Sequence, residues 1–381
     1  MSASIGASAQ NINRNVIQWQ ALQEDIAGRS SARYIEFMRA GQLDSAKSVL
    51  NDWQSQSNLS EPILRARILL AAKAGTYNDS VLPENIIDHI YLYRNRMGMI
   101  KTGDNEYYNN LPDYYGYISP GGEFDEYTQE LAAGLKDSFA QGTDEYFWTD
   151  FYSGGEGKVF ETAREGGMPV GKIAAEYNET VGKYINMGEY HFALSLGGWI
   201  PAWSMSAVGA HPEVGLQLGW KKKKFNYDLS LAFKFLDATK PYKTYTDYTG
   251  AAAYQTQTFV GFYAGFDFGY DIWSGKGQEM QLIGAVGVDW FKTLNPDIGY
   301  GRVNNMVAYS PFFGLGASYR WYVSNNMYIG VRLKYNFAHY PWSEIVRYSG
   351  HIVTLQFTVG LLGNGRRNSV LDALEYPYRG R

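Results

Sequence analysis

The side chains best suited to chemistry are acids and bases that recur at even spacing in the second half of this 381-residue chain. In segment 225–235, for example, Asp228 and Lys234 share one parity while Phe, Tyr and Leu occupy the other. Side chains on a strand point alternately to opposite faces, so the charges share one face. The charged face collects Asp228, Lys234, Asp267, Asp271, Asp289, Arg320, Arg332 and Lys334, with His191 and Lys221.

Charges that share an enclosed face can form ion pairs or can relay ions and protons. Isolated charges in a narrow interior are costly, so the acids and bases must pair there. The two signs occur in comparable numbers. The sequence therefore predicts a network of ion pairs that fills the interior, with an ion or proton pathway as the alternative.

A second group of candidate residues lies near the predicted extracellular rim, in the long connections between strands or next to them. His211, His339 and His351 fall there together with Ser204, Ser206, Asp247 and Glu344. A Ser–His–acid set needs contacts of about 2.6–3.2 Å, which spacing alone does not establish. The chain has no Cys, no His-x-x-x-His pattern and no phosphate-binding glycine motif. We therefore predict no enzymatic activity, metal or cofactor, and keep a rim enzyme acting on lipid or peptide as an alternative.

The elements that position these residues are alternating strands. Each has one almost wholly apolar parity, and several reach the roughly 9–11 residues that a tilted strand needs to cross a bilayer. No apolar run approaches the roughly 18–20 residues of a transmembrane helix. The predicted strands are 189–200, 213–221, 225–235, 258–273, 279–291, 311–323, 327–338 and 351–362.

The connections alternate between short and long. The short ones are 222–224, 274–278 and 324–326, and the long ones are 201–212, 236–257, 292–310 and 339–350. This alternation is typical of an outer-membrane barrel with short periplasmic turns and long extracellular loops. A soluble eight-stranded barrel is the alternative, and it would place the apolar parity inside.

Aromatic residues near the strand ends favour the membrane barrel. They fall at two levels, as expected of the girdles at the two membrane interfaces. One level holds Trp220, Trp273 and Trp321, and the other holds Trp203, Trp290, Tyr340 and Trp342.

With these strands and girdles, segment 189–362 resembles the eight-stranded outer-membrane barrels typified by the OmpA and OmpW families. The resemblance is one of architecture and covers slightly under half of the chain. It implies a membrane all-β fold, with both ends of the barrel segment on the periplasmic side. Some barrels of this kind are lipid-modifying enzymes or proteases, which is the source of the rim-enzyme alternative. OmpA-type proteins carry their periplasmic domain after the barrel, so no binding residues are carried over.

Residues 10–184 are predicted to form a mainly helical periplasmic domain. Tyr34 and Phe37 suggest one short helix and Leu50 and Trp53 a second, separated by Gly41. A further helix follows Glu61-Pro62, and this arrangement resembles a tetratricopeptide unit. Segments 84–96 and 124–139 are also predicted to be helical, with a turn-rich loop over 105–122. We make no prediction for 140–183.

The ends of the chain complete the predicted organisation. Ala7-Ser8-Ala9 resembles a signal-peptide cleavage site, so residues 1–9 are predicted to be a signal-peptide remnant. The barrel is assigned to 185–363, and 364–381 to a periplasmic C-terminal tail.

The predicted function is a non-enzymatic anchor or accessory subunit of the Gram-negative outer membrane. Its partners are outer-membrane lipid and a protein of an envelope complex that binds residues 10–184. The net charge of −4 gives no reason to expect nucleic acid. A small-solute conduit is a further alternative.

Overall fold

The computed structural model describes residues 3–245, 253–297, 302–343, 345–377 and 379. The chain divides into two compact units. The helical unit comprises Met1–Val181 with Ala373–Tyr376, and the barrel unit comprises Gly182–Asp372 with Pro377–Arg381. The division falls inside the last helix before the first strand, close to the predicted boundary at residue 185.

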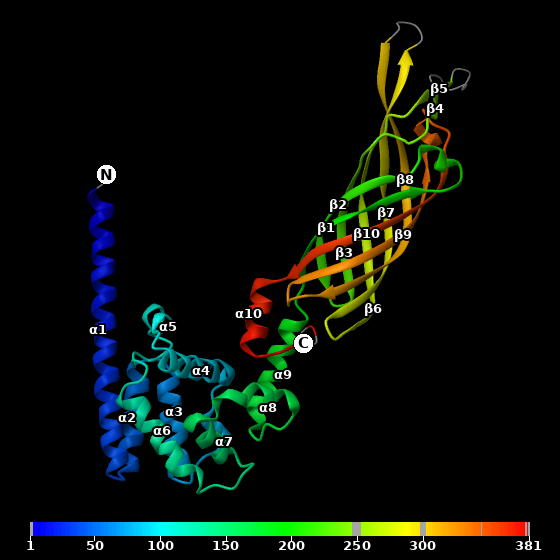
Figure 1. Ribbon diagram of the computed structural model, residues 1–381. Helices are drawn as coiled ribbons and strands as arrows, with labels where there is room; N and C mark the ends of the chain where they lie inside the picture. Colours follow the sequence, from blue (N-terminus) through cyan, green and yellow to red (C-terminus); the bar gives the residue numbers. More distant parts are fainter. Residues whose placement is uncertain (1–2, 246–252, 298–301, 344, 378, 380–381) are drawn as a thin grey trace. The chain divides into compact units, whose positions relative to one another are not determined.

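Helices make up the first unit (Figure 1). They are α1 (Ala3–Arg39), α2 (Leu43–Gln56), α3 (Glu61–Lys73), α4 (Ile86–Thr102), α5 (Glu106–Asn110), α6 (Glu123–Lys136), α7 (Asp144–Asp150), α8 (Val159–Glu165) and α9 (Gly171–Ile185), with short turns η1 (Asp79–Val81), η2 (Phe151–Gly155) and η3 (Glu156–Lys158).

The predicted helix break at Gly41 is confirmed, since this residue has a φ of +70° that glycine adopts without strain. The prediction of a short helix before it is wrong, because α1 runs through 37 residues. The turn-rich segment 105–122 contains the short helix α5. The Ala7-Ser8-Ala9 triplet lies within α1, and its role as a cleavage site stays a prediction.

The main core of the helical unit lies among α1, α2, α3 and α6. Tyr34 of α1 is fully buried and donates a hydrogen bond to the Ala66 carbonyl oxygen of α3 at 3.0 Å. Trp53 of α2 contacts the Phe124 ring of α6 edge-on at 5.9 Å between centroids. Apolar burial therefore holds this unit together. None of the described helices has the length and hydropathy required to cross a membrane.

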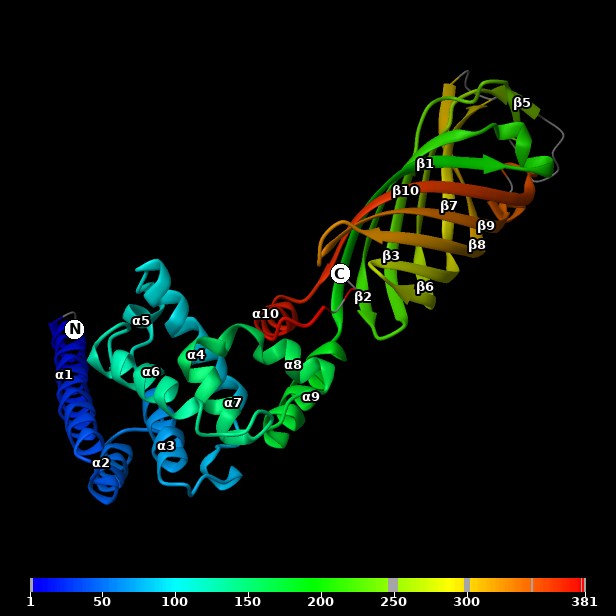
Figure 2. The same ribbon diagram turned by 60° about the horizontal axis from the view of Figure 1, so that its bottom comes forward.

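The second unit is a closed barrel of eight antiparallel strands, in the order β1-β10-β9-β8-β7-β6-β3-β2 (Figure 2). All eight predicted strands are present. Their bounds are β1 (Glu189–Pro201), β2 (His211–Lys222), β3 (Phe225–Lys234), β6 (Val260–Gly275), β7 (Gln278–Asp297), β8 (Arg302–Tyr322), β9 (Met327–His339) and β10 (Ser349–Gly363).

The faces of the barrel are those of a transmembrane barrel. Along β1, Leu194 and Leu196 are exposed on the outside, whereas Ala193 and Ser195 are buried inside. The other strands repeat this alternation, with apolar side chains outward and charged ones inward. A soluble barrel has the opposite arrangement, because its apolar core must lie inside.

Two connections differ from prediction. Segment 292–310 is not simply a loop, because β7 and β8 remain paired as far as Asp297 and Arg302. Connection 236–257 contains a small hairpin of β4 (Tyr242–Tyr245) and β5 (Ala253–Thr256). Short helical turns η4 (Trp203–Val208) and η5 (Tyr340–Ser343) lie in the other long connections. The predicted tail 364–381 begins with helix α10 (Gly365–Ala373).

One residue of the predicted aromatic girdle lies inside the barrel. Tyr340 has no exposed surface, because its hydroxyl donates a hydrogen bond to Asp289 at 2.6 Å and its ring packs on Phe291. Its assignment to the girdle is wrong. Trp203, Trp220, Trp273 and Trp321 are exposed, and Trp290 is half-buried against Phe262 on the outer face. The side chain of Trp342 lies outside the described part of the structure.

Candidate functional site: the barrel interior

The interior charges occupy successive levels along the barrel axis. At the end with the short turns, which we call the lower end, Lys221 of β2 contacts two acids. Its ammonium nitrogen lies 2.8 Å from Asp271 of β6 and 2.5 Å from Glu279 of β7. Glu279 also accepts a hydrogen bond from the Tyr322 hydroxyl at 2.8 Å and lies 3.8 Å from Arg320. This level is therefore a charge cluster shared by four strands.

The next level is organised by His191 of β1. Its Nδ1 lies 2.6 Å from Asp228 of β3, and its Nε2 lies 2.6 Å from the Tyr328 hydroxyl of β9. The Asn226 amide also donates to Asp228. The guanidinium of Arg320 lies 4.9 Å from the Tyr328 ring centroid. Both ring nitrogens of the histidine are thus occupied by groups from opposite walls.

Asp267 of β6 is the centre of the middle level. Arg332 of β9 donates to its carboxylate at 2.6 Å, and Lys334 lies 3.5 Å away. The Ser230 hydroxyl donates to the same carboxylate. Because the acid and the bases lie on opposite sides of the barrel, their ion pairs span its interior.

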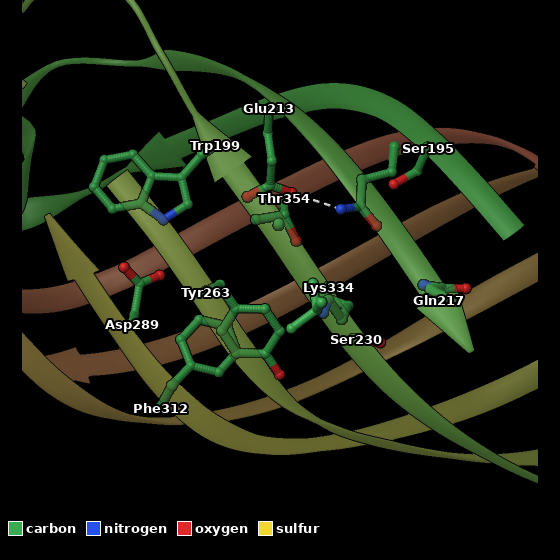
Figure 3. Close-up of a pocket in the computed structure, with 13 residues that line it drawn as sticks. Ser195, Trp199, Glu213, Gln217, Ser230, Tyr263, Asp289, Phe312, Lys334 and Thr354 are labelled. Carbon is green, nitrogen blue, oxygen red and sulfur yellow. Dashed lines mark hydrogen bonds between the residues drawn. The ribbon is translucent and has the colours of Figure 1, made fainter. Parts of the chain in front are cut away.

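The upper level pairs Lys234 with Asp289. The Lys234 ammonium also lies 4.8 Å from the Trp199 ring centroid, a cation–π contact. Close by, Gln356 donates to Glu213 at 2.5 Å (Figure 3). Figure 3 shows Trp199, Glu213 and Asp289 among the side chains from several strands that converge on one small cavity.

All eight charges predicted to form the network are buried inside the barrel. The interior also holds three acids that the prediction left out, Glu189, Glu213 and Glu279. Each of these acids has the same parity as the inward residues of its strand. Its inward direction could therefore have been predicted from the alternation. Asp271 and Arg320 are joined through Lys221 and Glu279, which makes Glu279 essential to the lower level.

The lower opening is occupied by residues from beyond the last strand. The Glu189 carboxylate forms an ion pair with the Arg367 guanidinium of α10, at 3.0 Å between nitrogen and oxygen, and a second one with Arg379 of the C-terminal segment. The Arg379 guanidinium also lies 4.5 Å from the Tyr322 ring centroid. This closure could not be predicted, because the tail has no periodic pattern that assigns it to the barrel.

Two small cavities remain within the network, each of about 10 Å³. Buried polar atoms without a protein hydrogen-bond partner line both. Trp199 Nε1 and Tyr263 Oη face the upper cavity, and Asn226 Oδ1 and Arg332 Nε face the lower one. A cavity of this size and polarity holds about one water molecule. The described interior is therefore packed with side chains, as expected for eight strands.

The rim residues that the structure describes contact a variety of neighbouring groups. His211 is buried and stacked on Phe259, with ring centroids 3.7 Å apart. His351 contacts Trp203 on the outer face. The Ser204 and Ser206 hydroxyls donate to the carbonyl oxygens of Ser349 and Trp203. The strand register pairs His339 with Ser349, and Asp247 and Glu344 lie outside the described residues.

A second cluster of buried charges, which the sequence did not reveal, lies in the helical unit. We call Glu61, Arg65, Arg96 and Asp125 the buried quartet. Arg65 and Arg96 each contact both acids at 2.7–3.0 Å, and all four side chains are at most 1% exposed. Glu61 and Arg65 are one helical turn apart on α3, a spacing at which side chains meet. The spacing of Arg96 and Asp125 gives no such indication, and only the packing of α3, α4 and α6 brings all four together.

The two acids of the quartet differ in their electrostatics. Burial raises the pKa of Glu61 above its usual value, although both arginines oppose this change. Burial also acts to raise the pKa of Asp125, but Arg65 and Arg96 outweigh it and the net pKa is lowered. Among the described residues, no group of three or more His, Asp or Glu has a geometry that could hold a metal ion.

Comparison with known proteins yields similarity only at the level of the barrel. No family model matches the chain, and no curated protein matches it. Among solved structures, surface protein A of Neisseria (NspA) is 11% identical, with a TM-score of 0.31, and the match covers 46% of this chain and 96% of that one. The N-terminal barrel of OprF from Pseudomonas aeruginosa is 11% identical, with a TM-score of 0.28, over 46% and 99% of the two chains.

Ail, the attachment invasion locus protein of Yersinia pestis, is 9% identical with a TM-score of 0.26. That match covers 46% of this chain and 97% of Ail. The barrel assignment itself rests on the strand register of this chain, which closes through eight antiparallel pairings.

Proposed function

We propose that this protein is a non-enzymatic anchor or accessory subunit of the Gram-negative outer membrane. In this proposal, the barrel fixes the chain in the bilayer and the helical unit binds a protein partner in the periplasm. The observation that carries the proposal is the filled interior. Ion pairs and hydrogen bonds cross it at every level, and the two cavities are each about the volume of one water molecule.

The orientation follows from the connections of the barrel. β1 begins and β10 ends at the lower end, level with the short turns. Short turns are periplasmic in outer-membrane barrels. We therefore place the helical unit and the C-terminal segment in the periplasm. The long connections, including the one that contains β4 and β5, are then outside the cell.

Two features favour a binding role over catalysis. The Ser204 and Ser206 hydroxyls are engaged by backbone carbonyl oxygens, so neither points at a histidine as a nucleophile would. The helical unit is large, with its own core, and can present a surface to another protein independently of the barrel.

The orientation can be tested directly because the chain contains no Cys. Single substitutions Lys240→Cys, in an outer connection, and Lys47→Cys, on α2, introduce one thiol each at exposed positions. A membrane-impermeant maleimide should label Lys240→Cys on intact cells and Lys47→Cys only after the outer membrane is opened. Labelling of Lys47→Cys on intact cells contradicts the orientation.

The binding role requires a separate experiment on the full chain. A photo-crosslinking amino acid at Lys47 or another exposed position of the helical unit should yield a discrete protein adduct in cells, whereas one at Lys240 should not. In planar bilayers the purified protein should show no steady conductance. Robust conductance would replace the anchor with a conduit, and the absence of any adduct across the helical surface would contradict the binding role.

A further inference from the structure

One surface of the helical unit has the composition of a binding site. Residues 102–122 contain five tyrosines and three acids, but no Lys or Arg. Tyrosine and tryptophan are enriched where proteins bind one another, because they offer large contact areas with little loss of conformational freedom. This segment therefore combines a high density of tyrosines with an absence of basic residues.

Four of the five tyrosines divide into a buried and an exposed set, and Tyr108 is half-buried. Tyr115 and Tyr117 are buried and fasten the segment to the unit. Arg96 donates to the Tyr115 carbonyl oxygen at 3.0 Å, and Tyr117 contacts Trp19 of α1 edge-on at 5.9 Å. Tyr107 and Tyr114, by contrast, are 62% and 58% exposed. The backbone is thus held in place while the outer rings remain accessible.

Apolar neighbours extend this area. Leu111 lies between the two exposed tyrosines in the sequence, and its side chain is also exposed. Trp19 is 49% exposed and adjoins the segment through Tyr117, and Leu22 lies one turn further along α1. We call Trp19, Leu22, Tyr107, Leu111 and Tyr114 the tyrosine surface. The Trp19–Tyr117 contact links the α1 part of this set to the segment, and clusters of exposed apolar side chains mark interaction sites in soluble domains.

The charged residues within the segment are all acids. Asp104 and Glu106 are exposed at the start of α5, where the Asp104 carboxylate accepts a hydrogen bond from the Glu106 backbone N–H at 3.0 Å. Asp113 accepts a hydrogen bond from Tyr117. Burial, Asp113 and Glu24 of α1 together raise the pKa of Tyr117, which places both acids near this ring.

We propose that the tyrosine surface binds a basic segment of the protein partner. Lys or Arg side chains of the partner would stack on Tyr107 and Tyr114 and form ion pairs with Asp104, Glu106 and Asp113. The acids exclude anionic lipid as the preferred occupant because like charges repel. This inference rests on the proposed function, since it specifies the chemistry of the partner that the helical unit binds.

The first test uses a defined probe with the full-length protein in phosphatidylcholine nanodiscs. The probe is a fluorescent decapeptide of alternating Arg and Ser, with a Glu-Ser decapeptide of equal length as its control. The Arg-Ser peptide should bind, and its affinity should fall steeply with salt. The Glu-Ser peptide should bind at least tenfold more weakly.

Substitutions then locate the binding. Tyr107→Ser with Tyr114→Ser removes the exposed rings, and Asp104→Asn with Glu106→Gln removes two charges while keeping a side-chain oxygen at position 104. Each pair should weaken Arg-Ser binding about tenfold. The matched control is Glu161→Gln with Glu165→Gln, two exposed acids of α8, which should leave binding unchanged. Equal losses in control and test variants, or no loss in either, overturn the proposal.

The final experiment separates this inference from the proposed function. The tyrosine-surface variants are combined with the crosslinking residue in the helical unit. Loss of the protein adduct with the tyrosine pair, but not with the α8 control, supports the inference. An adduct that persists in the tyrosine variants leaves the anchor function standing and places the partner elsewhere. Tighter binding of a glycan chain than of the Arg-Ser peptide would identify a different class of ligand and overturn the basic-partner proposal.

Discussion

The two units of this protein bury charge in opposite ways. The helical unit has an apolar core and encloses one compact cluster, the buried quartet, in which two acids face two bases. The barrel has an apolar exterior and an interior in which charged and polar side chains lie beside smaller apolar clusters. Solvent explains the difference. In water the interior is the place where apolar surface is removed from solvent, whereas in a bilayer the lipid already solvates apolar surface.

The comparison also shows how the cost of burying charge is met. In both units most buried acids contact a base, and Glu213 accepts a hydrogen bond from Gln356 instead. The connectivity of the ion pairs differs between the units. In the quartet each base contacts both acids, so removal of one base leaves two acids on a single partner. In the barrel the pairs are spread over levels, so one removal affects mainly its own level.

The largest expected effect is the loss of one arginine of the quartet. Arg96→Met should destabilise the helical unit by about 3–5 kcal/mol, because buried Glu61 and Asp125 would then share only Arg65. Urea unfolding of the full chain in detergent, followed by the helical circular dichroism signal, measures this loss. Arg39→Met breaks the exposed contact with Glu123 and should cost no more than about 1 kcal/mol. Similar losses in the two variants would contradict the special role of the quartet.

Arg332→Met should have the next largest effect. Asp267 would keep Lys334 at 3.5 Å and the Ser230 hydroxyl, so we expect a loss near the lower end of about 3–5 kcal/mol. Tryptophan fluorescence during denaturation, together with electrophoretic mobility without heating, reports on the barrel. In Lys334→Met, Asp267 keeps its shorter contact to Arg332, so this substitution should destabilise the barrel less than Arg332→Met does. A larger loss of stability in Lys334→Met than in Arg332→Met would show that Lys334, and not Arg332, is the main partner of Asp267.

A charge on the lipid face tests the solvent argument itself. Val286 lies on the outer face between the levels of Met280 and Trp290, so Val286→Arg should destabilise the barrel by about 2–4 kcal/mol. The adjacent change Ala285→Ser points into the polar interior and should be tolerated. Denaturation in lipid bilayers provides the measurement. If both changes were equally harmless, the outer face would not contact hydrocarbon.

The smallest effect concerns pH and the helical unit. Burial lowers the pKa of His89 below its usual value, so the unfolded chain takes up a proton at higher pH than the folded one. The stability of the helical unit should therefore decrease as pH falls from above 7 through about 6.5, the ordinary histidine pKa. His89→Gln should flatten this dependence in urea titrations at several pH values. An unchanged slope in His89→Gln would assign the pH dependence to another group.

The amino-acid sequence determined the barrel almost completely. Alternation with period two fixed the number of strands, their faces and the eight predicted interior charges, because a strand transmits its pattern directly to the two sides of a sheet. Glu213 and Glu279 were readable by the same rule. The burial of Tyr340 could not be predicted by this rule. It follows the last residue of β9, where alternation no longer determines the direction of a side chain.

Only the tertiary structure decided which charges meet. His191 with Asp228, Asp267 with Arg332 and the contacts between helices in the quartet join residues that are 29 to 65 positions apart in the chain. Periodicity specifies a face but carries no information about the partner across the barrel or between helices. The closure of the lower opening by Arg367 and Arg379 has the same origin. Strand pairing and helix packing set these distances, and they depend on the whole fold rather than on any local pattern.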